Sequence, residues 1–133
     1  MLVGDVVTRN PVCIDRNATI LVASTLMRVY QVENLVVTEQ YDGKLMPGGI
    51  LSARDIVTRV IATELDPAVV TVGDMMWSGP TGAKVTDSAS ETLKLLDAKK
   101  CNVLPVIDAD GGLAGVVSRG DLLWALGGNS ARC

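Results

Sequence analysis

The stretch Val3-Gly4-Asp5-Val6-Val7 returns 69 positions later as Val72-Gly73-Asp74-Met75-Met76. Further along each copy, Ser52-Ala53-Arg54-Asp55 has its counterpart in Ser118-Arg119-Gly120-Asp121. A chain that repeats its phrases in one order is a duplication, and each copy forms the same supersecondary unit. The 133 residues are therefore predicted to form two repeats of about 60 residues each. Because one such repeat is too small to hold a comfortable core alone, we expect the two to pack on each other.

Each repeat shows the same order of secondary-structure signals. A helix begins after Thr19 in the first repeat and after Ser88 in the second, where Ser88-Ala89-Ser90-Glu91 forms a capping-box pattern. Two β-branched runs joined by an Asp-Gly turn follow, which is typical of a hairpin. A second helix then begins at Ser52 or Ser118. The order strand, helix, strand, strand, helix predicts an α+β fold.

The alignment of the two copies also sets the expected boundaries. We predict a first repeat at residues 1–65, a connector at 66–71, a second repeat at 72–128 and a C-terminal tail at 129–133. Asp66-Pro67 marks the turn in the connector.

The composition excludes several classes of function. Histidine is absent, which removes the usual general base and the commonest metal ligand, so we expect neither an enzyme nor a metal site. A net charge of −3 with scattered basic residues argues against nucleic acid as a partner. No apolar run reaches the roughly 18 residues of a membrane span. We therefore expect a cytoplasmic protein that binds neither nucleic acid nor membrane.

The three cysteines are widely spaced and match no zinc or redox motif. We interpret Cys13 and Cys101 as small buried apolar residues. Cys133 is expected to be an exposed free thiol.

Taken together, the repeated elements resemble a tandem pair of cystathionine-β-synthase (CBS) domains, also called a Bateman module. The resemblance rests on the opening Val-Gly-Asp phrase, the helix after Thr19 or Ser88, the strand Leu104-Pro105-Val106-Ile107-Asp108, the Asp-Gly turn and the Gly-aliphatic-aliphatic-Ser-x-x-Asp stretch. The first repeat departs from the pattern at Val36, the counterpart of Pro105, and in its extra residues at 41–47. The resemblance implies two pseudo-symmetric β-α-β-β-α repeats packed sheet to sheet.

The sharpest local signal is Ser-x-x-Asp at both strand-to-helix junctions, from Ser52 to Asp55 and from Ser118 to Asp121. One interpretation is structural, because such a pair caps free N–H groups at the start of a helix. The other is functional, because a helix start attracts an anion and the carboxylate can accept two hydrogen bonds from a ribose diol. The presence of the pair in both repeats, together with the family resemblance, favours the functional interpretation.

In the family, the Asp of one repeat binds a ribose, the preceding Ser or Thr contacts phosphate, and the base lies in an apolar slot of the other repeat. The resemblance therefore implies two sites for an adenosyl ligand such as AMP, ADP, ATP or S-adenosylmethionine, with no further cofactor. The first site would contain Ser118, Gly120, Asp121, Thr8, Cys13, Val32, Glu33 and Asn34. The second site would contain Ser52, Arg54, Asp55, Trp77, Gly82, Cys101, Asn102 and Val103.

The two implied sites differ in charge and in aromatic content. Arg54 adds a cation suited to phosphate beside Asp55, whereas Gly120 adds none beside Asp121. Trp77 could stack on a purine. Residue chemistry therefore favours the Asp55 site for a charged nucleotide. The structural alternatives are that Arg54 is a solvated helix residue and that Trp77 belongs to an interface core.

Two functions remain open at this point. A regulatory module would bind the adenosyl ligand in the cleft between the repeats and signal to a separate effector protein, since family members usually regulate an attached enzyme, channel or transporter and none is visible here. An assembly module would have vestigial ligand sites and form a homodimer through the exposed helices at 53–61 and 122–126. The intact Ser and Asp residues of both repeats favour the regulatory module.

Overall fold

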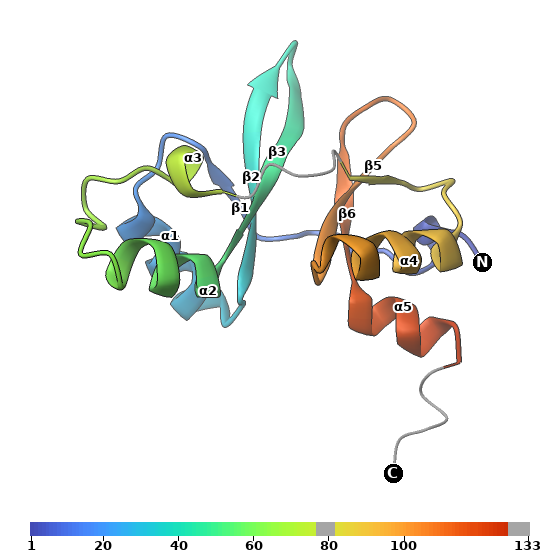
Figure 1. Ribbon diagram of the computed structural model, residues 1–133. Helices are drawn as coiled ribbons and strands as arrows, with labels where there is room; N and C mark the ends of the chain where they lie inside the picture. The colour runs from blue at the N-terminus through green and yellow to red at the C-terminus, as the bar shows by residue number, and fades with distance from the viewer. Residues whose placement is uncertain (77–81, 128–133) are drawn as a thin grey trace. The chain divides into compact units, whose positions relative to one another are not determined.

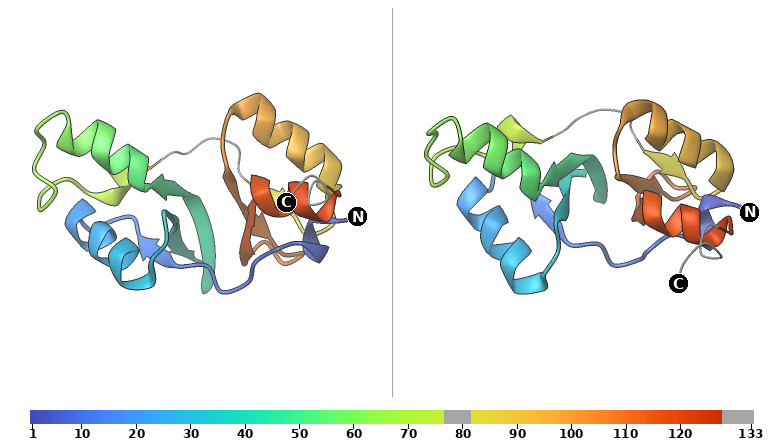
Figure 2. Two further views of the ribbon diagram at one scale, coloured as in Figure 1. Left: turned by 90° about the horizontal axis from the view of Figure 1, so that it is seen from below. Right: turned by 60° about the horizontal axis from the view of Figure 1, so that its bottom comes forward.

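The computed structural model describes residues 1–76 and 82–127, which belong to two compact units (Figure 1). The first-repeat unit is Pro11–Thr81, and the second-repeat unit is Met1–Asn10 together with Gly82–Cys133. Each unit carries a three-stranded mixed sheet with its long helices on one face (Figure 2). The predicted α+β class and the order strand, helix, strand, strand, helix are confirmed in both repeats.

In the first-repeat unit the sheet order is β1-β2-β3, with β1 parallel and β3 antiparallel to β2. The elements in chain order are β1 (Cys13–Asp15), α1 (Ile20–Tyr30), β2 (Asn34–Tyr41), β3 (Lys44–Ser52), α2 (Ala53–Ile56), the π-helical η2 (Val57–Ile61) and α3 (Val72–Met75). Helix α1 begins after Thr19, whose hydroxyl accepts a hydrogen bond from the Val22 N–H at 3.2 Å. Ile20, Ala23 and Met27 recur at helical spacing and are buried in the core that this helix shares with the sheet.

The hairpin of this unit is longer than its counterpart in the second repeat, because the extra residues at 41–47 extend both β2 and β3. Its predicted Asp-Gly turn is confirmed, with positive φ angles of 52° at Asp42 and 76° at Gly43. Two successive positive φ angles match the tight turn that joins twisted antiparallel strands.

The second-repeat unit repeats this arrangement with the sheet order β4-β5-β6. Its elements are η1 (Val3–Asp5), β4 (Ala83–Lys84), α4 (Ala89–Lys99), β5 (Val103–Ile107), β6 (Leu113–Ser118) and α5 (Arg119–Ala125). Ser88 caps α4 by accepting a hydrogen bond from the Glu91 N–H at 3.3 Å. The reciprocal half of the predicted capping box does not form among the described residues, because the Glu91 carboxylate lies 3.7 Å from the Lys94 ammonium on the helix surface instead.

Each compact unit contains the opening segment of the other repeat. Residues 3–7 belong to the second-repeat unit, and residues 72–76 belong to the first-repeat unit. In the second-repeat unit, the N–H groups of Val3 and Gly4 donate to the carbonyls of Asp87 and Val85, both at 2.9 Å. In the first-repeat unit, the N–H groups of Val72 and Gly73 donate to the carbonyls of Ala18 and Arg16, both at 2.8 Å. Each unit is therefore completed by the opening phrase of the other sequence repeat, so the compact units cross the repeat boundaries drawn from the sequence.

The glycine of each opening segment lies where its backbone closely approaches the backbone of another segment. A Cβ atom on Gly4 would lie 3.0 Å from the Val85 carbonyl oxygen, and one on Gly73 would lie 3.1 Å from that of Arg16. Residues 1–10 make a second close approach at Gly115 on β6, where a Cβ would lie 2.2 Å from the Thr8 carbonyl oxygen. The N-terminal segment therefore packs closely through a glycine at both of its ends, Gly4 of the segment itself at one end and Gly115 of β6 at the other.

Replacing Gly115 with alanine is expected to lower the free energy of unfolding by about 1–3 kcal/mol, because the Thr8 backbone must move to admit the methyl group. The measurement is urea unfolding with linear extrapolation. Gly120→Ala is the matched control, since its Cβ would meet only the Ser118 hydroxyl at 4.0 Å and a helical alanine stabilises by about 0.5–1 kcal/mol. Equal stability of Gly115→Ala and the unmodified chain would contradict the tight approach.

Candidate functional site

The Ser-x-x-Asp pair of the first repeat forms a complete capping box. Ser52 ends β3 and accepts a hydrogen bond on its hydroxyl from the Asp55 N–H at 3.0 Å. The Asp55 carboxylate accepts in return from the Ser52 N–H at 3.4 Å. Both side chains are half-buried. The capping bonds that the structural interpretation expects are therefore present at this pair, and one oxygen of the Asp55 carboxylate is engaged within its own helix.

The pair of the second repeat is capped on one side. The Ser118 hydroxyl accepts from the Asp121 N–H at 3.0 Å. Asp121 is exposed, and within residues 1–76 and 82–127 no group donates a hydrogen bond to its carboxylate. The two junctions share one backbone geometry, with the same φ and ψ at Ser52 and Ser118, and differ in the carboxylate that remains able to accept hydrogen bonds.

A backbone hydrogen bond ties each junction to the start of the preceding strand. The Ala53 N–H donates to the Glu33 carbonyl at 2.8 Å, and the Arg119 N–H donates to the Asn102 carbonyl at 2.8 Å. Strand register places Asn34 opposite Ser52 in the same way that it places Val103 opposite Ser118. The structure thus brings Glu33 and Asn34 to Ser52, and Asn102 and Val103 to Ser118, within single repeats. The sites that the family resemblance implies instead group Glu33 and Asn34 with Asp121, and Asn102 and Val103 with Asp55. That grouping stays a prediction.

The charges beside the two junctions are also unequal. Arg119 donates from its Nε to the Asp97 carboxylate at 2.6 Å, so its charge is paired on α4. Arg54 is exposed on α2, and no carboxylate of the described residues pairs with its guanidinium. Trp77, the predicted base platform, lies outside the described residues. The Arg54 guanidinium predicted beside Asp55 is therefore exposed and able to meet an anion.

The remaining predicted residues lie close to the strands. Thr8 bridges to Val116 through backbone hydrogen bonds of 2.8 and 2.9 Å, and its side chain is exposed. Gly82 has a φ of 112° and approaches the Pro105 carbonyl so closely that a Cβ would lie 2.6 Å from its oxygen. Val32 is partly buried and packs against the core of the first-repeat unit. Thr8 and Gly82 thus make close backbone contacts and Val32 packs on the core, and the contact of all three with a ligand stays a prediction.

Cys13 and Cys101 are half-buried rather than fully buried. Cys13 lies in β1, pairs with Val36 and donates from its thiol to the Pro11 carbonyl at 3.5 Å. Burial raises the pKa of the Cys13 thiol. It also raises the pKa of the Cys101 thiol, against the opposing effects of a backbone hydrogen bond and the Lys99 charge. Both thiols are therefore protonated at neutral pH and are weak nucleophiles there.

Residues 1–76 and 82–127 lack two further kinds of feature. No group of three or more His, Cys, Asp or Glu side chains in these ranges is placed to hold a metal ion. In the same ranges, no helix has both the length and the apolar character that crossing a bilayer requires.

Comparison with known proteins decides the family. A family model described as "CBS domain" matches residues 3–62 and matches again at residues 72–128. The chain belongs to the CBS domain family. The two matches account for most of the chain and confirm that it carries a tandem pair of CBS domains.

Two known proteins are similar along most of this chain. Uncharacterized protein MK0525 of Methanopyrus kandleri is 27% identical over 121 residues, which is 91% of this chain and 60% of that protein. Hypoxic response protein 1 of Mycobacterium tuberculosis is 26% identical over 118 residues, which is 89% of this chain and 80% of that protein. This chain therefore spans less than two thirds of the Methanopyrus protein, and it spans only 16–17% of four CBS domain-containing proteins of Arabidopsis thaliana.

Solved structures show the same fold. A crystal structure of Hypoxic Response Protein I with two coordinated zinc ions is 25% identical with a TM-score of 0.80, covering 94% of this chain and 98% of that one. The CBS domain pair of protein MJ0100, in complex with 5′-methylthioadenosine and S-adenosyl-L-methionine, is 21% identical with a TM-score of 0.79, covering 97% and 98%. At 21% identity the second likeness shows the fold.

The thiols provide one test of the site. In a Cys133→Ser background, we expect Cys13 and Cys101 to react with a maleimide several-fold more slowly at neutral pH in the folded chain than in urea, because burial favours the protonated form. Since only the thiolate reacts, the rate in the folded chain should rise about tenfold per pH unit until the raised pKa is reached. Equal rates in the folded and unfolded chains would show that the thiols are not shielded.

The two aspartates provide another test. Both lie in the first turn of a helix and gain similarly from its dipole, but only the Asp55 carboxylate also accepts a capping bond. Asp55→Ala should therefore lower the free energy of unfolding by about 0.5–1.5 kcal/mol more than Asp121→Ala does, measured by urea unfolding without ligand. Equal losses in the two variants would contradict the unequal capping.

Proposed function

We propose that this CBS pair is a regulatory module that binds an adenosyl ligand and signals to a separate effector protein. The observation that carries the proposal is the repeated junction itself, a Ser-capped helix start that holds an Asp carboxylate in the first turn of both repeats. The carboxylate can accept two hydrogen bonds from a ribose diol, and the helix start favours a phosphate or carboxylate nearby. The fold that this chain shares with the MJ0100 pair supports the adenosyl class of ligand.

Within this proposal, Asp121 is the stronger ribose acceptor. Its carboxylate is exposed and accepts no hydrogen bond from the residues of the described ranges, whereas that of Asp55 already accepts one from Ser52. A ribose diol that binds both oxygens of Asp55 therefore shares one of them with the capping bond, whereas at Asp121 both oxygens are open to it. This preference is opposite to the one drawn from residue chemistry alone, in which Arg54 favoured the Asp55 site. Arg54 still supports a more highly phosphorylated ligand there.

Signalling requires the ligand to bind two arrangements of the module with different affinity. AMP, ADP, ATP and S-adenosylmethionine share the adenosyl group that an Asp would read, and they differ in the charge that Arg54 or a helix start would meet. In this proposal, the charge of the group attached to the ribose distinguishes these ligands, and the effector responds to the arrangement that the bound ligand favours.

The second candidate function is an assembly module with vestigial ligand sites. The observation that favours it is the exposure of apolar side chains on the second helix of each repeat, with Val57 59%, Ile61 55% and Trp124 55% exposed. Side chains of this kind favour a protein partner over open solvent.

Isothermal titration calorimetry of the ligand-stripped chain tests the proposal against AMP, ADP, ATP and S-adenosylmethionine, with GTP as the purine control. We expect saturable binding of at least one adenosyl compound and none of GTP. Asp121→Ala should weaken that binding by about tenfold to hundredfold through the lost hydrogen bonds to the ribose. Glu64→Ala, an exposed acidic residue outside both junctions, is the control for charge and should bind as the unmodified chain does.

Folded protein that binds none of the four adenosyl compounds would overturn the proposal and leave the assembly module. Binding that survives in Asp55→Ala, in Asp121→Ala and in the double variant would refute the ribose role of both carboxylates.

A further inference from the structure

An ion pair joins the two long helices of the second-repeat unit. The Nε of Arg119, the first residue of α5, donates to the Asp97 carboxylate on α4 at 2.6 Å. The two residues are 22 positions apart in the sequence, and α4 ends beside the start of α5 (Figure 1). Their side chains are 43% and 51% exposed, and an ion pair this exposed contributes little to stability.

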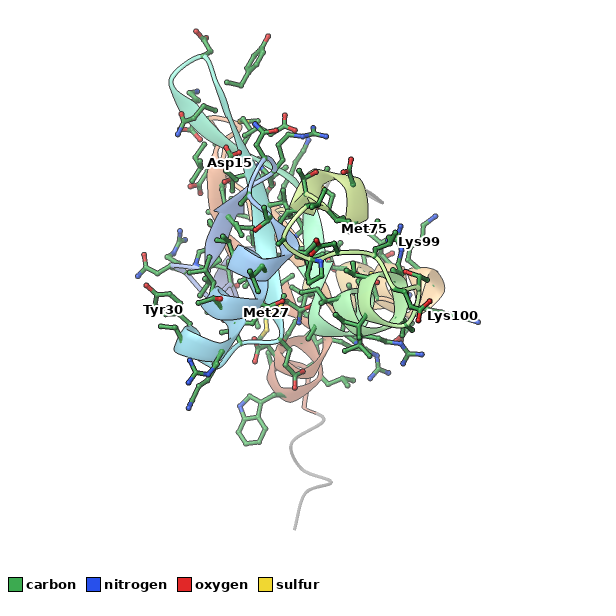
Figure 3. All side chains as sticks on the ribbon, turned by 90° about the vertical axis from the view of Figure 1, so that its left-hand side faces the viewer. Asp15, Met27, Tyr30, Met75, Lys99 and Lys100 are labelled. Carbon is green, nitrogen blue, oxygen red and sulfur yellow. The ribbon has the colours of Figure 1, made fainter. Side chains whose placement is uncertain are left out.

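Each member of this pair lies at the end of its helix that disfavours its charge. Asp97 is in the last turn of α4, where the helix dipole favours cations. Arg119 begins α5, where the dipole favours anions. Lys99 and Lys100, at the same end of α4, follow the usual preference (Figure 3). Asp97 and Arg119 are therefore unfavourable for their own helices, and each is stabilised by the other.

The first repeat has no such pair at the matching positions. Asp97 corresponds to Arg28, a cation in the last turn of α1 that suits the dipole there, and Arg119 corresponds to Ala53. The fold therefore does not require an ion pair between these two helices. A departure from helix preferences that occurs in one repeat alone, with two members that compensate each other, points to a local requirement of the second junction.

The two junctions differ in what holds the first turn of the helix. In the first repeat, the Ser52 N–H donates to the Asp55 carboxylate at 3.4 Å, so the carboxylate itself ties the turn to the preceding strand. In the second repeat, the pair of Arg119 and Asp97 ties the start of α5 to α4. The Asp121 carboxylate accepts no hydrogen bond from residues 1–76 and 82–127. The second junction is thus held by a contact that leaves its carboxylate free.

We propose that Arg119 and Asp97 are positioning residues for ligand binding at Asp121. Their ion pair fixes the first turn of α5, so the Asp121 carboxylate is held in place with both oxygens open to a ribose diol. This role rests on the proposed function, in which Asp121 binds the ribose. Residues two positions apart in a helix do not face each other, so Arg119 acts through the helix start and not by contacting the ligand beside Asp121.

The positioning role predicts the same effect on charged and uncharged ligands. Loss of the ion pair loosens a carboxylate that meets the ribose of adenosine and of AMP alike. A direct contact between Arg119 and phosphate predicts a different result, because release of Arg119 from Asp97 would then strengthen the binding of AMP and leave that of adenosine unchanged.

Isothermal titration calorimetry with adenosine and with AMP tests the proposal in an Asp55→Ala background, which leaves Asp121 as the junction carboxylate. We expect Asp97→Asn to weaken the binding of both ligands by about threefold to tenfold, because the Asp121 carboxylate must then be ordered when the ligand binds. The urea midpoint should change little, since an exposed pair is lost while an unfavourable acid is removed from the end of α4.

Two further variants separate positioning from a general structural effect. Lys94→Ala breaks the 3.7 Å pair with Glu91 on the same helix, and as the matched control it should bind both ligands as the background does. The charge exchange Asp97→Arg/Arg119→Asp restores an attractive pair and should return adenosine binding to within about twofold of the background. Circular dichroism confirms that each variant is folded before its affinity is compared.

Unchanged binding in Asp97→Asn, opposite effects on adenosine and AMP, a folded charge exchange that does not regain adenosine binding, or an equal loss in Lys94→Ala would each overturn the proposal. If the unmodified chain binds one of these ligands and the Asp55→Ala background binds neither, the ribose is held at Asp55, and the positioning role alone is overturned. An unmodified chain that binds no adenosyl compound would overturn the proposed function together with this role.

Discussion

The hydrogen bonds made by the two opening phrases are the interactions on which both compact units depend. A repeat of about 60 residues buries only a modest share of its surface on folding, and in each unit a fully buried valine, Val3 or Val72, comes from the other repeat. The N–H groups of each valine and of the glycine that follows it donate to carbonyls of the other sequence repeat. The glycine allows the two backbones to approach closely. Each core is therefore completed by residues that are distant in sequence, and neither repeat forms its native core from its own residues alone.

The strand-to-helix junctions show one residue pattern in two hydrogen-bonding arrangements. Ser-x-x-Asp satisfies the first free N–H groups of a helix, and this need exists whether or not a ligand is present. A carboxylate that completes the cap is less available to an outside donor, as at Asp55, while one that does not is more available, as at Asp121. The duplication thus holds two states of one motif in one chain, and they differ in whether the carboxylate accepts a capping bond.

Much of the fold could be predicted from the sequence because its signals are local. Thr19 and Ser88 as caps, the apolar spacing of α1 and the Asp42-Gly43 turn each depend on a few neighbouring residues, and all three are observed. The exchange of the opening phrases could not be predicted, because the carbonyls that accept from Val3 and Val72 are chosen by packing across the whole chain. Similarly, the sequences around Asp55 and Asp121 are alike, and only the position of the carboxylate oxygen distinguishes them. Helix α1 has apolar residues on two sides, and which of them are exposed depends on which side of the helix the sheet covers.

The exchanged opening phrases also bear on how such a chain arises. A half-length chain with one repeat would have an opening segment without a place in its own core and a vacant position that a second copy would fill, so it would be complete only as a reciprocal pair. Fusion of two such copies turns this bimolecular exchange into an intramolecular one and removes its dependence on concentration. Once fused, the two halves are free to diverge, since a substitution no longer occurs twice in every assembly. The open carboxylate of one junction and the capped carboxylate of the other are a difference that two identical copies could not hold.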